Sequence, residues 1–123
     1  MKQKLGYSVL EAARQRVRYS FDHFEKVCVS FSGGKDSSVL FHLAADEARR
    51  RGRRLAVLII DLEAQYELTI AHAEEMCDLY SDCVDLYWIC LPIKLRNAVS
   101  NYEPVWCAWE PGREKDWVRQ PPK

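Results

Sequence analysis

Residues 32–38, SGGKDSS, bring together more side chains able to contact an anion than any other part of this sequence. They lie between the apolar run KVCV and the helix-like stretch VLFHLAAD. Glycines let backbone amides approach an anion closely, while hydroxyl and ammonium groups add hydrogen-bond donors. A helix that starts here would direct its N-terminal amides and positive dipole at the same place. The stretch therefore predicts a phosphate-binding loop rather than an ordinary strand-to-helix turn.

Each residue type in the loop has a separate expected use. The expected phosphate contacts are two glycines, a lysine and three serines: Gly33, Gly34, Lys35, Ser32, Ser37 and Ser38. Asp36 does not fit simple anion binding, because a carboxylate repels phosphate. It can instead cap the following helix by accepting amide hydrogens, or hold a Mg²⁺ ion that bridges to the phosphates.

Two familiar nucleotide-binding motifs do not match this loop. A Walker A loop, GxxxxGK[ST], requires glycine at position 29 and Ser or Thr after Lys35, but the sequence has Val29 and Asp36 there. A GxGxxG dinucleotide fingerprint is also absent. The loop therefore belongs to another class of phosphate site.

Apolar periodicity predicts the elements that position the loop. Ser8 followed by Glu11 is typical of a helix N-cap with its capping-box partner. The expected elements are helix 8–23, strand 26–31, helix 37–51, strand 55–61, helix 66–80 and strand 84–91. Alternating strands and helices indicate a parallel sheet with right-handed crossovers. Ligands of such sheets bind at the carboxyl ends of the strands, where the loop would lie.

Outside the loop, the sequence pattern indicates which side chains pack in the interior. Helix 66–80 is expected to bury an apolar stripe, namely Tyr66, Ile70, Ala73, Cys77 and Tyr80. Residues 92–123 show no clear period and predict an irregular tail, in which Trp106, Trp109 and Trp117 are expected to cover the core. Residues 1–123 are expected to form a single domain.

The segment SGGKDS resembles the PP-loop, SGGxDS, of the ATP pyrophosphatase superfamily. Within it, the chain is similar to the PAPS reductase-like family. IIDLEAQYELTIAHAEEM (59–76) resembles that family's DTGxxxPETxxF region, with Asp61 and Thr69 aligned but the glycine and the Pro-Glu pair missing. The resemblance implies the adenine nucleotide alpha hydrolase-like fold, a three-layer α/β/α sandwich with a parallel sheet. Family members are usually longer, so a shortened version of the domain is expected.

The resemblance also implies an activity. The loop would bind the β- and γ-phosphates of ATP with Mg²⁺, and ATP would be cleaved between its α- and β-phosphates to adenylate an unidentified acceptor. Lys35 and Asp36 would be catalytic, with Asp36 orienting the loop or the Mg²⁺. Asp61 would bind ribose or metal, or simply end its strand, and adenine would lie near Ile59 and Ile60. The reductases' ECGxH motif is absent, so sulfonucleotide reduction is not expected.

VSFSGGKDSSVLFHLA and YEPVWCAWEPGREKDWVR together resemble a narrower group. These are PAPS reductase-like proteins of phages and prophages, described as co-activators of prophage gene expression. This implies a second hypothesis, a non-catalytic nucleotide sensor with a ParB-like protein partner. A third is an interaction module whose loop binds no nucleotide. A homo-oligomer is left open.

Composition sets the remaining limits. The formal net charge is +0 and 48% of residues are hydrophobic, which is typical of a globular protein. No apolar run suits a membrane span or a signal peptide, so a cytoplasmic location is expected. The five cysteines contain no CxxC pair, which indicates neither a disulfide framework nor a zinc site. The lone histidines His23, His42 and His72 are expected to be structural.

The run RRRGRR (49–54) leaves two interpretations open. It can be a cationic helix end followed by a solvated turn, or a contact for nucleic acid or an acidic partner. In either case it is expected at the opposite end of the sheet from the phosphate loop.

Overall fold

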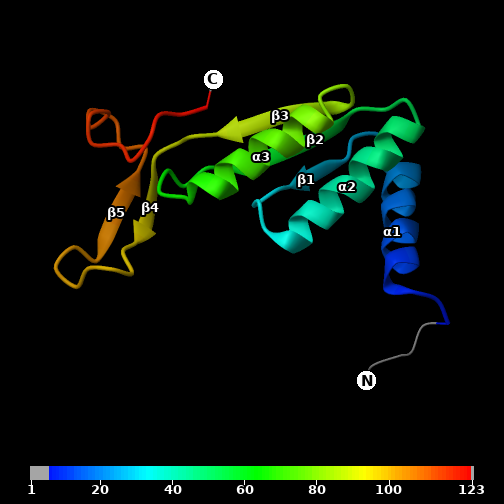
Figure 1. The fold of residues 1–123 in the computed structure, drawn as a ribbon, viewed down its shortest axis with the longest axis horizontal. Coiled ribbons are helices and arrows are strands. Elements are labelled where there is room, and N and C mark those ends of the chain that lie inside the picture. Colours follow the sequence, from blue (N-terminus) through cyan, green and yellow to red (C-terminus); the bar gives the residue numbers. More distant parts are fainter. Residues whose placement is uncertain (1–5, 123) are drawn as a thin grey trace.

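A three-stranded parallel sheet forms the centre of the computed structural model, which describes residues 6–122. Its strands are β1 (Cys28–Ser30), β2 (Leu55–Ile60) and β3 (Val84–Ile89), in the order β1-β2-β3 (Figure 1). The register places Cys28 opposite Ala56, and Leu55 opposite Val84. The expected mixed α/β class with a parallel sheet is confirmed.

Helices α2 (Lys35–Arg50) and α3 (Glu67–Leu79) connect these strands and cover one face of the sheet (Figure 1). Two right-handed crossovers that proceed in the same direction place both helices on the same side. Val57 and Phe41 are fully buried in the core between the sheet and the helices. Helix α1 (Val9–His23) packs against α2.

The other face of the sheet carries no helix in the described part of the chain. Register places Leu58 opposite Tyr87, and Ile60 opposite Ile89, on that face. Ile60 is 50% exposed and Tyr87 is 55% exposed. Of the three expected layers, the described residues therefore form the sheet and one helical layer.

The structure corrects the boundary of the helix that follows the loop. Helix α2 begins at Lys35, two residues earlier than predicted, with Gly34 as its N-cap and no side-chain cap hydrogen bond. Asp36 therefore lies in the first helical turn, and its expected alternative role as a helix cap is wrong. The N-cap of α1 is as predicted, since the Glu11 amide donates to Ser8 Oγ at 3.1 Å.

The sequence pattern places Tyr66 in the buried stripe of α3, and this prediction is wrong. The residue precedes the helix in extended conformation, with φ −63° and ψ 139°, and it is 86% exposed. Because it lies outside the helical geometry, its side chain does not follow the face that Ala73 and Cys77 bury. Met76, which the pattern did not include, is buried with them.

The tail is more regular than predicted. It contains β4 (Ile93–Arg96) and β5 (Val105–Ala108), which pair antiparallel in a hairpin at the end of the molecule opposite α1 (Figure 1). Each strand is only four residues long, too short for a clear sequence period. Trp109 is 2% exposed and packs edge-on against Trp117. Among the described residues, neither ring belongs to the hydrophobic core between the sheet and the helices or packs against it, so the expected covering of that core is not observed.

The arginines of 49–54 bond within the fold at the amino ends of the strands. Arg49 pairs with Asp82, and Arg54 with Asp85 at 2.6 Å. The Arg53 guanidinium donates to the Phe21 carbonyl at 2.5 Å, tying the end of α1 to the start of β2. These contacts support the structural interpretation of the run.

Glu47 lies at the centre of this arginine cluster and is 8% exposed. Its Oε1 atom accepts from Arg50 Nη2 and Arg51 Nε, both at 2.5 Å. The Arg50 hydrogen bond, opposed by burial and aided by Arg51, lowers the Glu47 pKa from 4.5 to about 2.

None of the helices in residues 6–122 has both the length and the apolar character that crossing a membrane requires.

Replacing Glu47 with glutamine is expected to lower the free energy of unfolding by about 2 kcal/mol at neutral pH. Because the folded pKa is depressed, the carboxylate stabilises the protein fully above pH 4.5 and loses its effect as pH falls towards 2. Urea unfolding of both proteins between pH 7 and 2 measures this. The gap between them should narrow over that window, and a gap that does not change with pH would contradict the assignment.

Candidate functional site

The predicted phosphate loop connects the end of β1 to the start of α2. Gly33 has φ +77°, a left-handed conformation that favours glycine, whereas Gly34 has φ −79°. A Cβ atom on residue 33 would lie 2.7 Å from Thr69 Cγ2 of α3. The loop therefore needs glycine at 33 for two reasons, its conformation and the close approach of α3.

The serine hydroxyls of the loop bond to the loop itself. Ser37 Oγ and Ser38 Oγ lie 3.0 and 2.8 Å from the Gly34 carbonyl oxygen. Ser37 Oγ is also 3.0 Å from Ser32 Oγ. A hydroxyl has one proton, so if Ser37 donates to the carbonyl, Ser32 donates to Ser37. Whereas the sequence suggested hydroxyls free to contact phosphate, this structure uses them to shape the loop.

The open donors are instead at the start of α2. The first amides of a helix have no intrahelical acceptor, and Gly34 provides no side-chain cap. Lys35 and Asp36 are exposed, and within residues 6–122 neither side chain has a hydrogen bond or ion pair. The amides and the Lys35 ammonium group thus form an open cradle for an anion.

The sequence left two roles open for Asp61, a ligand for ribose or metal and a simple strand end. It follows β2 and is completely buried. Its Oδ1 accepts from the Glu63 amide at 2.8 Å, and its Oδ2 accepts from Trp88 Nε1 at 2.6 Å and from the Arg119 guanidinium. Both carboxylate oxygens accept hydrogen bonds from the protein itself. In this structure the Asp61 side chain therefore joins several segments in the interior and does not line an open crevice.

Glu63 is a second buried carboxylate at the end of β2, and no sequence motif singles it out. It has φ +66° and accepts from the amides of Trp109 at 2.6 Å and Val118 at 2.9 Å. Together with Asp61 it anchors the tail to the carboxyl end of the sheet. The only signal in the sequence was two acids in three residues after an apolar strand.

A small hollow lies beside the loop, where the loop, α3 and the end of β2 meet. Ser32 and Gly33 line one side, and the residues that complete it are Phe31, Ile59, Ile60, Gln65, Thr69, Ile70, Ala73 and Trp88. Ile59 and Ile60, expected beside adenine, thus adjoin the loop. The structure therefore brings the loop and these two residues together, whereas it turns the Asp61 side chain into the protein.

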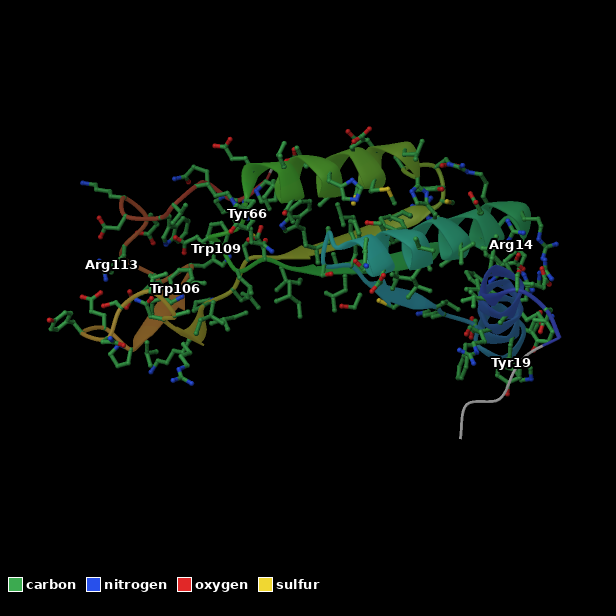
Figure 2. The ribbon with its side chains drawn as sticks, turned by 60° about the horizontal axis from the view of Figure 1, so that its bottom comes forward. Arg14, Tyr19, Tyr66, Trp106, Trp109 and Arg113 are labelled. Carbon is green, nitrogen blue, oxygen red and sulfur yellow. The ribbon has the colours of Figure 1, made fainter. Side chains whose placement is uncertain are left out.

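A larger cavity of about 550 Å³ lies in the tail, where Figure 2 shows Trp106 and Arg113 at one end of the molecule. No residue of the loop lines it. Its charged side chains partly neutralise each other, since Arg113 pairs with Glu110 and Asp116. The loop, with its open amides, is the better candidate for chemistry despite its smaller hollow.

Comparison with known proteins defines the class of this chain. Residues 26–103, which include β1, the loop and β3, match the phosphoadenosine phosphosulfate reductase domain. The chain belongs to this family. A relative is "Uncharacterized protein YbdN" of Escherichia coli (strain K12), which is 45% identical over 120 residues. The alignment covers 97% of this chain and 29% of the relative, so the chain spans less than a third of the relative's length.

Proposed function

We propose that the protein binds ATP at the loop 32–38 and cleaves it between the α- and β-phosphates. The observation that carries this proposal is the open start of α2, where uncapped amides adjoin the exposed Lys35. Family membership supports a nucleotide as the source of the anion. The match of residues 32–37 to the PP-loop pattern favours ATP as that nucleotide. The proposed location of this activity is the cytoplasm.

The proposed reaction is an adenylyl transfer. A nucleophilic atom of the acceptor attacks the α-phosphorus, and the bond from that phosphorus to the bridging oxygen breaks. Pyrophosphate leaves with the bonding electrons, and the acceptor releases its proton to solvent. The α2 amides and Lys35 would stabilise the charge that develops on the leaving pyrophosphate.

The residues present fit a Mg²⁺ ion bound mainly through the nucleotide. The described residues contain no group of three or more His, Cys, Asp or Glu side chains placed to hold a metal. Mg²⁺ commonly uses one or two carboxylates together with phosphates and water. Asp36 is exposed beside the cradle and would supply that carboxylate. The ion would neutralise phosphate charge when bound.

A second candidate function is a nucleotide-binding regulator of phage or prophage genes that does not turn ATP over, acting with a ParB-like protein. The observation that favours it is the pairing of Asp61 with Trp88 and Arg119. That pairing occupies one carboxylate that could have bound ribose or metal.

Lys35→Ala is expected to weaken Mg²⁺-ATP binding by about 10- to 100-fold, because hydrogen bonds to charged groups contribute about 1.5–3 kcal/mol. Isothermal titration calorimetry measures the change. Lys94→Ala, an exposed lysine on β4 outside the loop, is the matched control and should bind like the wild type.

Pyrophosphate release distinguishes the candidate functions. AMP and pyrophosphate from Mg²⁺-ATP and cell extract, lost in Lys35→Ala, would support the enzyme. Binding without cleavage would support the regulator. If the wild-type protein does not bind ATP, both nucleotide proposals are wrong.

A further inference from the structure

His72 of α3, expected from the sequence to be a lone structural histidine, bonds to the loop. Its Nε2 atom lies 2.8 Å from Ser38 Oγ, and the contact is partly buried. Ser38 Oγ is also 2.8 Å from the Gly34 carbonyl oxygen. A continuous hydrogen-bonded chain thus runs from α3 through Ser38 to Gly34, the N-cap of α2.

Counting protons gives this chain a direction. A carbonyl oxygen only accepts, so the Ser38 hydroxyl must donate its single proton to Gly34. Ser38 then has only lone pairs to offer His72, and the Nε2 atom must carry a proton and donate it. In the opposite tautomer, Nε2 has no proton to donate. The single Ser38 proton could then serve only one of the two 2.8 Å contacts, and the other contact would bring two acceptors together with no proton between them.

The position of the Gly34 carbonyl controls where the next amide points. A peptide unit is planar and trans, so the Gly34 C=O and the Lys35 N–H point in opposite directions. The carbonyl is held by Ser37 Oγ, Ser38 Oγ and the Ser38 amide, the last at 2.9 Å. Holding the carbonyl towards the helix keeps the Lys35 amide directed out into the anion cradle.

Helix α3 also fixes the other limb of the loop. Thr69 lies one turn before His72 on the same side of the helix. Its methyl group covers Gly33, leaving no room for a Cβ atom there. Thr69 and His72 of α3 therefore contact the loop at two points, one at Gly33 and one at Ser38.

We propose that His72 is a positioning residue for the phosphate cradle: it donates from Nε2 to Ser38 and thereby fixes the Gly34–Lys35 peptide in its anion-binding orientation. This inference rests on the proposed function, because it assigns His72 a part in the same site. The probe is inorganic pyrophosphate with Mg²⁺.

His72→Phe keeps a ring but removes the donor, and it should weaken pyrophosphate binding about tenfold. His72→Gln places an amide donor at a similar reach and should bind within about threefold of the wild type. Ser38→Ala should match His72→Phe, and the double variant should lose little more than either single variant, because both break one chain. Equal binding by wild type and His72→Phe would overturn the proposal.

His42→Phe is the matched control, since His42 is a partly buried histidine on α2 that bonds to Tyr80 Oη at 2.7 Å, away from the loop. It should alter thermal stability without altering pyrophosphate affinity; a similar loss of affinity would overturn the specific role of His72. If His72→Phe fails to fold, Ser38→Ala and His72→Gln carry the same comparison.

A second readout is independent of ligand binding. ¹⁵N NMR of neutral His72 should show the proton on Nε2, and a proton on Nδ1 would overturn the proposed donor. If the wild type binds no pyrophosphate, the proposed function fails, and with it the role of His72 in binding.

Discussion

Replacing Arg119 with methionine is expected to lower the free energy of unfolding by about 3–5 kcal/mol, because removing one partner of a buried ion pair leaves an uncompensated charge. Asp61 is completely buried and Arg119 is only 20% exposed. The carboxylate would keep its bonds to Trp88 and the Glu63 amide but lose its only cation among the described residues. Such a loss is a large fraction of the total stability of a typical domain.

Arg113→Met in the same tail is the matched control. Its side chain is 63% exposed, and its partners Glu110 and Asp116 are also exposed. Exposed pairs contribute about 1 kcal/mol or less, so this variant should unfold close to the wild type. Urea denaturation compares the two. If Arg119→Met is as stable as Arg113→Met, Asp61 does not depend on Arg119.

A double variant tests the pairing directly. Asp61→Asn removes the carboxylate charge while keeping a polar group beside Trp88. When both changes are combined, the loss of unfolding free energy should be smaller than the sum of the two single losses. The reason is that the double variant contains neither charge, so no buried charge is left unpaired. Additive losses would mean that the two side chains act separately.

The Asp61–Arg119 pair also explains what the sequence could not show. The loop, the three strands of the parallel sheet and the helices follow from local patterns, such as valine-rich runs, the Ser8 N-cap and paired glycines. Arg119 lies 58 residues from Asp61 along the chain, and no local pattern links them. From the sequence, Asp61 was therefore either a ligand-binding group or a simple strand end, whereas the fold uses it to anchor the tail.

The loop shows a different limit of sequence reasoning. Residue types identify possible donors but not the acceptors that their protons reach. Ser37 and Ser38 were expected to contact phosphate, whereas their hydroxyls converge on the Gly34 carbonyl. His72, which has no motif of its own, becomes part of the site only because the crossover from β2 brings α3 beside the loop.

Replacing Gly33 with alanine is expected to be the most damaging single change in the loop. Gly33 has φ +77°, and an alanine Cβ would lie 2.7 Å from Thr69 Cγ2. The left-handed conformation costs an L-residue about 1–2 kcal/mol, and overpacking adds about 1–3 kcal/mol. The same movement would displace the start of α2, so Mg²⁺-ATP binding should fall by more than about tenfold, as measured by calorimetry.

Two other glycines separate these contributions. Gly52 has φ +62°, and a Cβ atom there would meet nothing within 4 Å, so Gly52→Ala measures the conformational cost alone. Gly34 has φ −79° and only Ser32 Oγ nearby, at 3.5 Å, so Gly34→Ala should be tolerated within about 1 kcal/mol. The stability difference between Gly33→Ala and Gly52→Ala therefore reports the contact with Thr69.

Thr69→Ser removes the methyl group that meets the new Cβ. In the Gly33→Ala background it should recover the overpacking part of the loss and leave the conformational part, bringing that protein close to Gly52→Ala in stability. If Thr69→Ser recovers nothing, α3 does not rest on Gly33, and the loop would owe its shape to its own hydrogen bonds. Recovery of stability without recovery of ATP binding would instead show that the left-handed conformation at residue 33 is itself what directs the amides of α2 towards the phosphates.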